Sequence, residues 1–75
     1  MDIADIMIHF HPDIPAAQRA TIETTLADCT GVISAHFSPQ HPQELTVAYD
    51  PEAINAQTIL TQVRRWDAAA AMAGL

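Results

Sequence analysis

Apolar residues recur at every second position between residues 6 and 10, with polar or less apolar residues between them. This period of two is typical of a strand with one buried face. The same period places His9 and His11 together on the other, solvent-facing side. A Pro-Asp-Ile-Pro segment ends the strand. Its last residue, Pro15, suits the first turn of a helix, where the missing N–H costs nothing.

The segment from residue 16 to about residue 30 has the spacing of an amphipathic helix. Ile22, Leu26 and Cys29 fall at i, i+4 and i+7 on one helical face. Gly31 is the expected stop, since glycine commonly ends a helix. We expect Cys29 to be a small buried hydrophobe on this face. The alternative is a nucleophile or a metal ligand.

Residues 32–38 and 44–49 are predicted to form two strands joined by a polar loop. In the later strand Leu45, Val47 and Tyr49 alternate with Thr46 and Ala48, which predicts one buried face. The loop contains two prolines, which cannot donate to a ladder of backbone hydrogen bonds. The two strands therefore form a hairpin.

A second helix is predicted from the N-cap residue Asn55 to about Trp66. Its buried stripe consists of Ile59, Leu60 and Val63.

The alanine-rich tail, residues 68–73, has two interpretations. Alanine has the highest helix propensity, which favours a longer second helix. A strand would instead pair the otherwise open edge of the first strand. We favour the strand, which gives the order βαββαβ of the ferredoxin-like arrangement. The prediction is an α+β sandwich of one domain, residues 1–75, with a four-stranded antiparallel sheet and two helices on one face.

The segment from Gly31 to Pro51 resembles the back half of a heavy-metal-associated domain. It has a glycine-ended helix, a strand, a short polar loop and a strand closing on Tyr-Asp-Pro before a new helix. That family includes small copper chaperones and the N-terminal domains of metal-pumping ATPases, and it carries Cys-x-x-Cys between its first strand and first helix. By the family's spacing these two positions fall on Pro15 and Gln18. The resemblance therefore implies the fold but not the thiolate site, and Cu(I) binding by thiolates is not expected.

In this fold the end of the first strand, the hairpin loop and the exit of the second helix lie at one end of the domain. The resemblance implies that the family's metal loop lies there. Three histidines, His9, His11 and His41, fall at this end and are the candidate metal ligands, with Asp13 as a further oxygen donor. Neutral imidazole suits Zn²⁺, Cu²⁺ and Ni²⁺. The alternative is a polar outer sheet face without metal.

Other residues near this end also have two interpretations. Trp66 either closes the end of the core or forms an exposed interaction spot. Arg64 and Arg65 are favourable charges at a helix C-terminus, or they tune a bound ligand. His36 is expected to be a solvated residue, separated from His9 by a strand.

The charge and the cysteine content of the chain limit the classes of binding partner and the cellular compartment that we expect. The chain has three Arg, no Lys and nine acidic residues, a formal charge of −6. This charge disfavours nucleic acid and anionic membrane surfaces. No apolar run reaches the ~20 residues of a membrane span, and no signal peptide is visible. One cysteine excludes an internal disulfide framework. We therefore expect a cytoplasmic protein.

No nucleophile-plus-base arrangement, glycine-rich phosphate loop or pair of catalytic carboxylates is visible, so we do not expect an enzyme. We interpret the chain as a small metal-handling or metal-sensing module with imidazole ligands. The alternative is a metal-free module for protein–protein interaction that retains only the scaffold.

Overall fold

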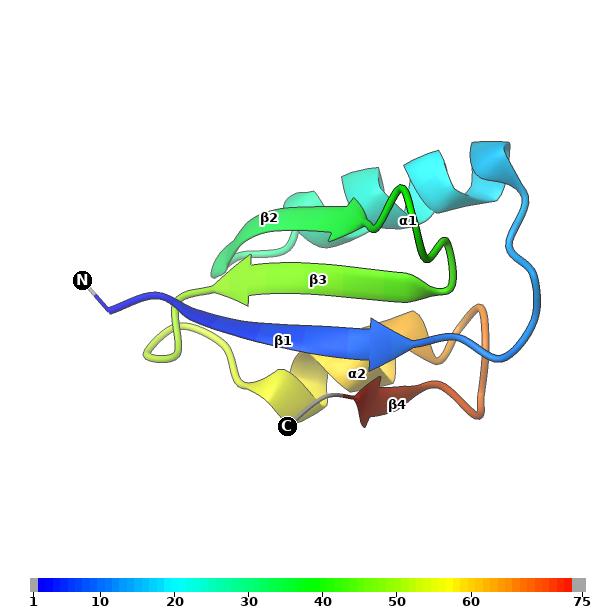
Figure 1. The fold of residues 1–75 in the computed structure, drawn as a ribbon. Helices are drawn as coiled ribbons and strands as arrows, with labels where there is room; N and C mark the ends of the chain where they lie inside the picture. Colours follow the sequence, from blue (N-terminus) through cyan, green and yellow to red (C-terminus); the bar gives the residue numbers. More distant parts are fainter. Residues whose placement is uncertain (1, 74–75) are drawn as a thin grey trace.

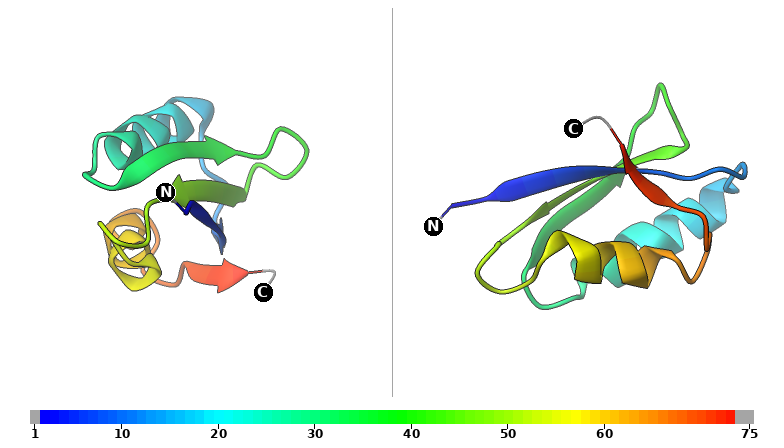
Figure 2. Two further views of the ribbon diagram at one scale, coloured as in Figure 1. Left: turned by 90° about the vertical axis from the view of Figure 1, so that its left-hand side faces the viewer. Right: turned by 90° about the horizontal axis from the view of Figure 1, so that it is seen from below.

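The computed structural model describes residues 2–73. Its elements are β1 (Ala4–His9), α1 (Ala16–Ala27), β2 (Val32–Phe37), β3 (Glu44–Tyr49), α2 (Ala56–Val63) and β4 (Ala71–Ala73). The strands form one antiparallel sheet in the order β2-β3-β1-β4 (Figure 1). Both helices lie on one face of this sheet, and the other face is open (Figure 2). The predicted ferredoxin-like fold is therefore confirmed.

The core lies between the sheet and the two helices. It is built from alternate residues of the strands, from one stripe of each helix and from three residues outside these elements: Phe10, Ile14 and Ala70. Its members are Ile6, Ile8, Phe10, Ile14, Ile22, Leu26, Ala35, Leu45, Val47, Tyr49, Ile59, Leu60, Val63 and Ala70. Val32 and Phe37 pack against this core and are only partly buried. They lie on β2, an edge strand, where one side has no neighbouring strand.

The first helix ends earlier than predicted. It stops at Ala27, and the chain then turns tightly, with the Cys29 N–H donating to the Leu26 carbonyl at 3.0 Å. Because Cys29 lies in this turn, it is half-buried and outside the core, and the expectation of a buried helical cysteine is wrong. Its Sγ contacts the Thr25 carbonyl at 3.5 Å. Gly31 has a φ of +93° and serves the turn into β2.

The second helix begins as predicted and also ends early. The Asn55 side chain accepts a hydrogen bond from the Thr58 N–H at 2.8 Å, which confirms the N-cap. The helix ends at Val63 instead of near Trp66. Only the last part of the alanine-rich segment, Ala71–Ala73, forms a strand, β4, which pairs with β1 from Met7 to His9. Among residues 2–73, no helix combines the length and the apolar character needed to cross a membrane.

Candidate metal site

Three segments meet at one end of the sheet, as predicted: the exit of β1, the β2–β3 loop and the α2–β4 turn (Figure 1). Hydrogen bonds join them. The Phe10 N–H donates to the Gln43 carbonyl at 2.8 Å, and Gln43 Nε2 donates to the His11 carbonyl at 2.8 Å. The His11 N–H donates to Asp67 Oδ2 at 2.9 Å. The backbone beneath the candidate histidines is therefore fixed from both sides.

His9 and His11 lie on the same side of β1 and its extension. Their ring centroids are 5.5 Å apart, and the ring planes are nearly perpendicular, at 85°. The His11 side chain is 56% exposed, and His9 is half-buried. The period-two prediction for these two residues is therefore confirmed, and their rings are in contact range.

The ring of His11 also meets a carboxylate. His11 Nδ1 lies 3.3 Å from Asp67 Oδ2, and Asp67 Oδ1 accepts the Ala69 N–H at 3.0 Å. The hydrogen bond from the His11 backbone is the main reason why the pKa of Asp67 lies below its ordinary value of 3.8; burial opposes it, and the Ala69 N–H and the His11 ring add to it. An ionised carboxylate beside His11 is thus the stable form.

His41 lies on the β2–β3 loop and is exposed. Together with His9 and Asp13 it lines a shallow hollow of about 300 Å³. The hollow is completed by Gln40, Pro42, Gln43 and Glu44. His11 does not line it, so His9 is the residue common to the two arrangements. Asp13, expected as an oxygen donor, faces the same hollow.

Within residues 2–73, no three His, Cys, Asp or Glu side chains are grouped closely enough to hold a metal ion as they stand. The structure pairs His9 with His11, and it places His9, His41 and Asp13 around one hollow. A complete ligand set would require side chains to turn or the β2–β3 loop to move. Water molecules are the other available ligands.

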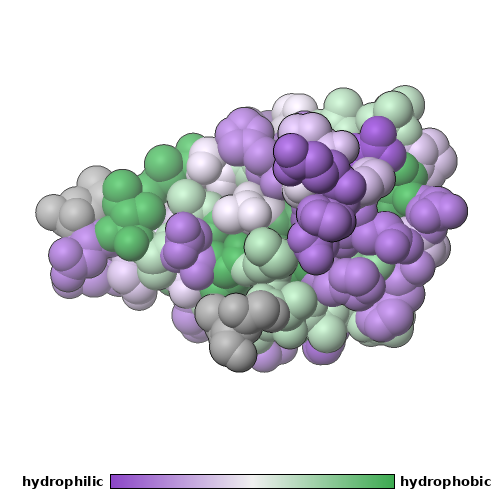
Figure 3. Space-filling model, viewed as in Figure 1, coloured by the Kyte–Doolittle hydropathy of each residue, from purple (hydrophilic) through white to green (hydrophobic). Residues whose placement is uncertain are grey.

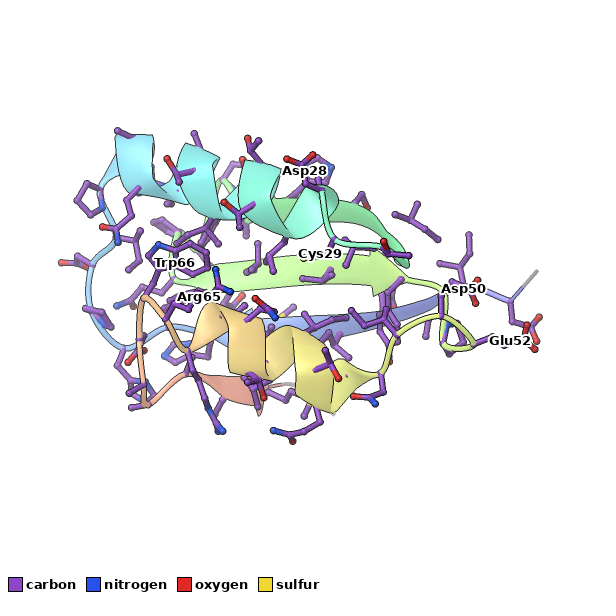
Figure 4. The ribbon with its side chains drawn as sticks, turned by 180° about the vertical axis from the view of Figure 1, so that it is seen from behind. Asp28, Cys29, Asp50, Glu52, Arg65 and Trp66 are labelled. Atoms are coloured by element: carbon purple, nitrogen blue, oxygen red, sulfur yellow. The ribbon has the colours of Figure 1, made fainter. Side chains whose placement is uncertain are left out.

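The two positions at which heavy-metal-associated domains carry cysteines, as the resemblance assigns them, lie at the start of α1. Pro15 is the N-cap residue and is exposed, and Gln18 follows in the first turn. Cys29 lies in the turn that follows α1, at the other end of this helix from Pro15 and Gln18 (Figure 4). His36 is exposed on β2, which β3 separates from β1, as predicted.

Trp66 and the two arginines have different roles at the exit of α2. Trp66 is half-buried and packs against the core, so it closes the core at this end (Figure 4). Arg64 Nε donates to the Ala70 carbonyl at 3.2 Å, which ties the helix end to the start of β4. Arg65 is exposed.

Two residues of this site were not predicted from the sequence. Asp67 and Gln43 hold His11 from two different segments, and Asp67 lies 56 positions away along the chain. A local signal existed only for the turn at Asp67, because an Asp followed by small residues often accepts a backbone N–H two positions later. Nothing local indicated that the same carboxylate reaches a histidine.

Hydrophilic residues gather on the open face at the end where β1 stops and the β2–β3 loop lies (Figure 3). Among the described residues the large exposed apolar side chains are Ile3, Ile33 and Met72. Met72 lies opposite Ile8, next to the pair of Ala71 and His9. The candidate site is therefore a polar, solvent-facing surface.

Comparisons with known proteins support the fold. No family model matches the chain, and no curated protein matches its sequence. Among solved structures, oxidized MerP from Ralstonia metallidurans CH34 superposes with a TM-score of 0.73. The match covers 96% of each chain at 12% sequence identity. At this identity the likeness shows the fold alone.

Proposed function

We propose that this chain is a small metal-handling or metal-sensing module in which imidazoles bind a divalent transition metal ion. The ring pair of His9 and His11, with centroids 5.5 Å apart, carries the proposal. Two imidazoles that share one ion through metal–nitrogen bonds of ~2.0 Å have ring centroids roughly 5–6 Å apart. Only a reorientation of the rings is then needed to place a nitrogen of each on one ion.

The remaining ligands come from the hollow beside His9. His41 and Asp13 line it, and both are exposed. Imidazole nitrogen and carboxylate oxygen suit Zn²⁺, Cu²⁺ and Ni²⁺, whereas Cu(I) prefers soft sulfur ligands. The net charge of −6 also favours a cationic ligand. The proposed ligands are therefore His9, His11 and His41, with Asp13 or water completing the site.

The fold supports a metal-handling role in a general way. The sequence resembles heavy-metal-associated domains, and oxidized MerP shares the fold of this chain. Its likeness to this chain supports the scaffold and not the ligands, because Pro15 and Gln18 stand at the positions where that family carries cysteines. The non-enzymatic role and the cytoplasmic location expected from the sequence are parts of this proposal.

Calorimetry with Zn²⁺, Ni²⁺ and Cu²⁺ at neutral pH, together with NMR of the histidine rings, tests the proposal. We expect binding heat and shifted ring signals for His9 and His11. The variant His11→Ala should weaken binding strongly. The matched control His36→Ala removes an exposed histidine two strands away and should bind as the wild type does. No heat and no shifted ring signals at millimolar metal would exclude the metal-handling function.

The second candidate function is metal-free protein–protein interaction. The observation that favours it is that both edge strands carry an exposed large apolar side chain: Ile33 on β2 is 49% exposed, and Met72 on β4 is 36% exposed. Edge strands also offer unpaired backbone groups to a partner. The same metal titration separates the two functions, because a metal-free interaction module should show no binding heat and no shifted histidine signals.

A further inference from the structure

The carboxylate of Asp67 holds both the backbone and the ring of His11. Oδ2 accepts the His11 N–H at 2.9 Å and lies 3.3 Å from Nδ1 of the same residue. Oδ1 accepts the Ala69 N–H at 3.0 Å. The Asp67 side chain is only 9% exposed, whereas that of His11 is 56% exposed. A fixed, sheltered acceptor therefore holds one edge of a ring that otherwise faces solvent.

The chemistry of this contact selects one form of the neutral ring. An ionised carboxylate is an acceptor only, so the ring must meet it through a protonated Nδ1. A neutral imidazole with its proton on Nδ1 has its lone pair on Nε2, on the far side of the ring. The hydrogen bond made by one ring nitrogen sets which nitrogen is available to a metal. Histidines that bind metals usually donate their other N–H to a carboxylate or a carbonyl.

We propose that Asp67 is a positioning residue that keeps neutral His11 in the Nδ1–H form and leaves Nε2 as its metal-binding atom. This inference rests on the proposed function and adds a residue to it that contacts no metal itself. It also distinguishes His11 from His9 and His41, which have no carboxylate at a ring nitrogen among residues 2–73.

A purely structural role for Asp67 would require only its two backbone contacts. Asp50 provides the comparison at the opposite end of the molecule. Its Oδ1 accepts the Glu52 N–H at 3.0 Å, the same two-residue turn contact that Asp67 makes with Ala69. No histidine contact is present at Asp50 among the described residues. The variant Asp50→Asn therefore removes the same charge from the same type of turn without affecting a ring.

The first experiment measures the ¹⁵N chemical shifts of the His11 ring in the metal-free protein at about pH 8.5, well above the ordinary histidine pKa. The wild type should show the Nδ1–H form. The variant Asp67→Asn should shift the ring toward the Nε2–H form, which free histidine prefers. The control Asp50→Asn should match the wild type. A wild-type His11 in the Nε2–H form would overturn the inference without any variant.

The second experiment measures Ni²⁺ or Zn²⁺ affinity of the same three proteins. Asp67→Asn should lose about tenfold to a hundredfold in affinity, the usual effect of removing such a partner. Asp50→Asn should lose none. Unchanged affinity in Asp67→Asn would overturn the positioning role even if the wild type binds metal. If the wild type binds no metal yet shows the Nδ1–H form, the proposed function fails while the control of the ring by Asp67 stands.

Discussion

The backbone of Gly31 lies directly against the side chain of Ile54. A Cβ on residue 31 would lie 2.8 Å from Ile54 Cγ2 and 3.0 Å from the Cβ of Ala53. The φ of Gly31 is +93°, a region that L side chains rarely adopt. Its carbonyl accepts the Asp50 N–H at 2.8 Å. Gly31 thus joins the α1–β2 turn to the β3–α2 loop, at the end of the domain opposite the histidines.

The variant Gly31→Ala should lower the free energy of unfolding by roughly 1–3 kcal/mol, because the backbone is strained for any L side chain and the new methyl group collides with Ile54. Denaturant unfolding measures this loss. In an Ile54→Ala background the collision is reduced, so the loss from Gly31→Ala should be smaller. An equal loss in both backgrounds would show that the collision contributes nothing and that only the backbone strain matters.

The variant Val47→Asp should destabilise the protein by roughly 3–5 kcal/mol, because it buries a charge without a partner. Val47 is fully buried on β3. Thermal unfolding followed by circular dichroism measures the effect. The control Thr46→Asp places the same residue on the exposed face of the same strand and should cost about 1 kcal/mol or less. Equal losses for the two variants would contradict the register of β3.

The sequence predicted those parts of the fold that depend on local patterns. The alternation around Val47 gave the buried face of β3, and the Asn55 cap gave the start of α2. The ends of both helices were placed too late, because hydrophobic spacing continues into the tight turns that follow each helix. Cys29 is an example: it has the helical spacing, yet it lies in a turn. The choice between helix and strand for the tail depended on pairing with β1, which local propensity does not report.

The candidate site was only partly predictable for the same reason. That His9 and His11 share one side follows from the period of a strand. The meeting of three segments at that end follows from the fold. Which polar side chains fix His11 does not follow, because Gln43 and Asp67 reach it from segments that are distant in the sequence. The separation of His11 from the hollow that contains His41 likewise depends on side-chain placement, which no pattern encodes.

Stability should fall at acidic pH partly through Asp67. The pKa of its carboxyl is lowered below 3.8 in the folded protein, chiefly by the hydrogen bond from the His11 backbone. The contribution of Asp67 to the free energy of unfolding is therefore fully present above the unfolded-state pKa of 3.8. It is lost as the pH falls through the lower pKa of the folded state. Denaturant unfolding from neutral to acidic pH tests this. The stability difference between wild type and Asp67→Asn should shrink on acidification, and a constant difference would contradict it.

The protein should have no tight Cu(I) site. By the resemblance to heavy-metal-associated domains, Pro15 and Gln18 stand where that family carries cysteines, and Cys29 lies in the turn at the other end of α1. Competition against a high-affinity Cu(I) chelator should leave the protein without copper. The double variant Pro15→Cys/Gln18→Cys should gain Cu(I) binding, because two thiols three residues apart at a helix start face the same way. Stoichiometric copper retained by the wild type, and lost in Cys29→Ser, would indicate a thiolate site shared between two chains.

Binding of a divalent metal should compete with protons, because only neutral imidazole is a ligand. The affinity for Zn²⁺ or Ni²⁺ should therefore fall as the pH drops through about 6.5, the ordinary histidine pKa. His11→Ala should weaken binding most, since His11 is the ring held by a carboxylate and lies against His9. Cys29→Ser should leave the metal affinity unchanged.

Calorimetry at several pH values, with release of protons to the buffer as a second readout, tests this pH dependence. Metal binding with no pH dependence over this range would contradict histidine ligands and would indicate that carboxylates bind the metal instead.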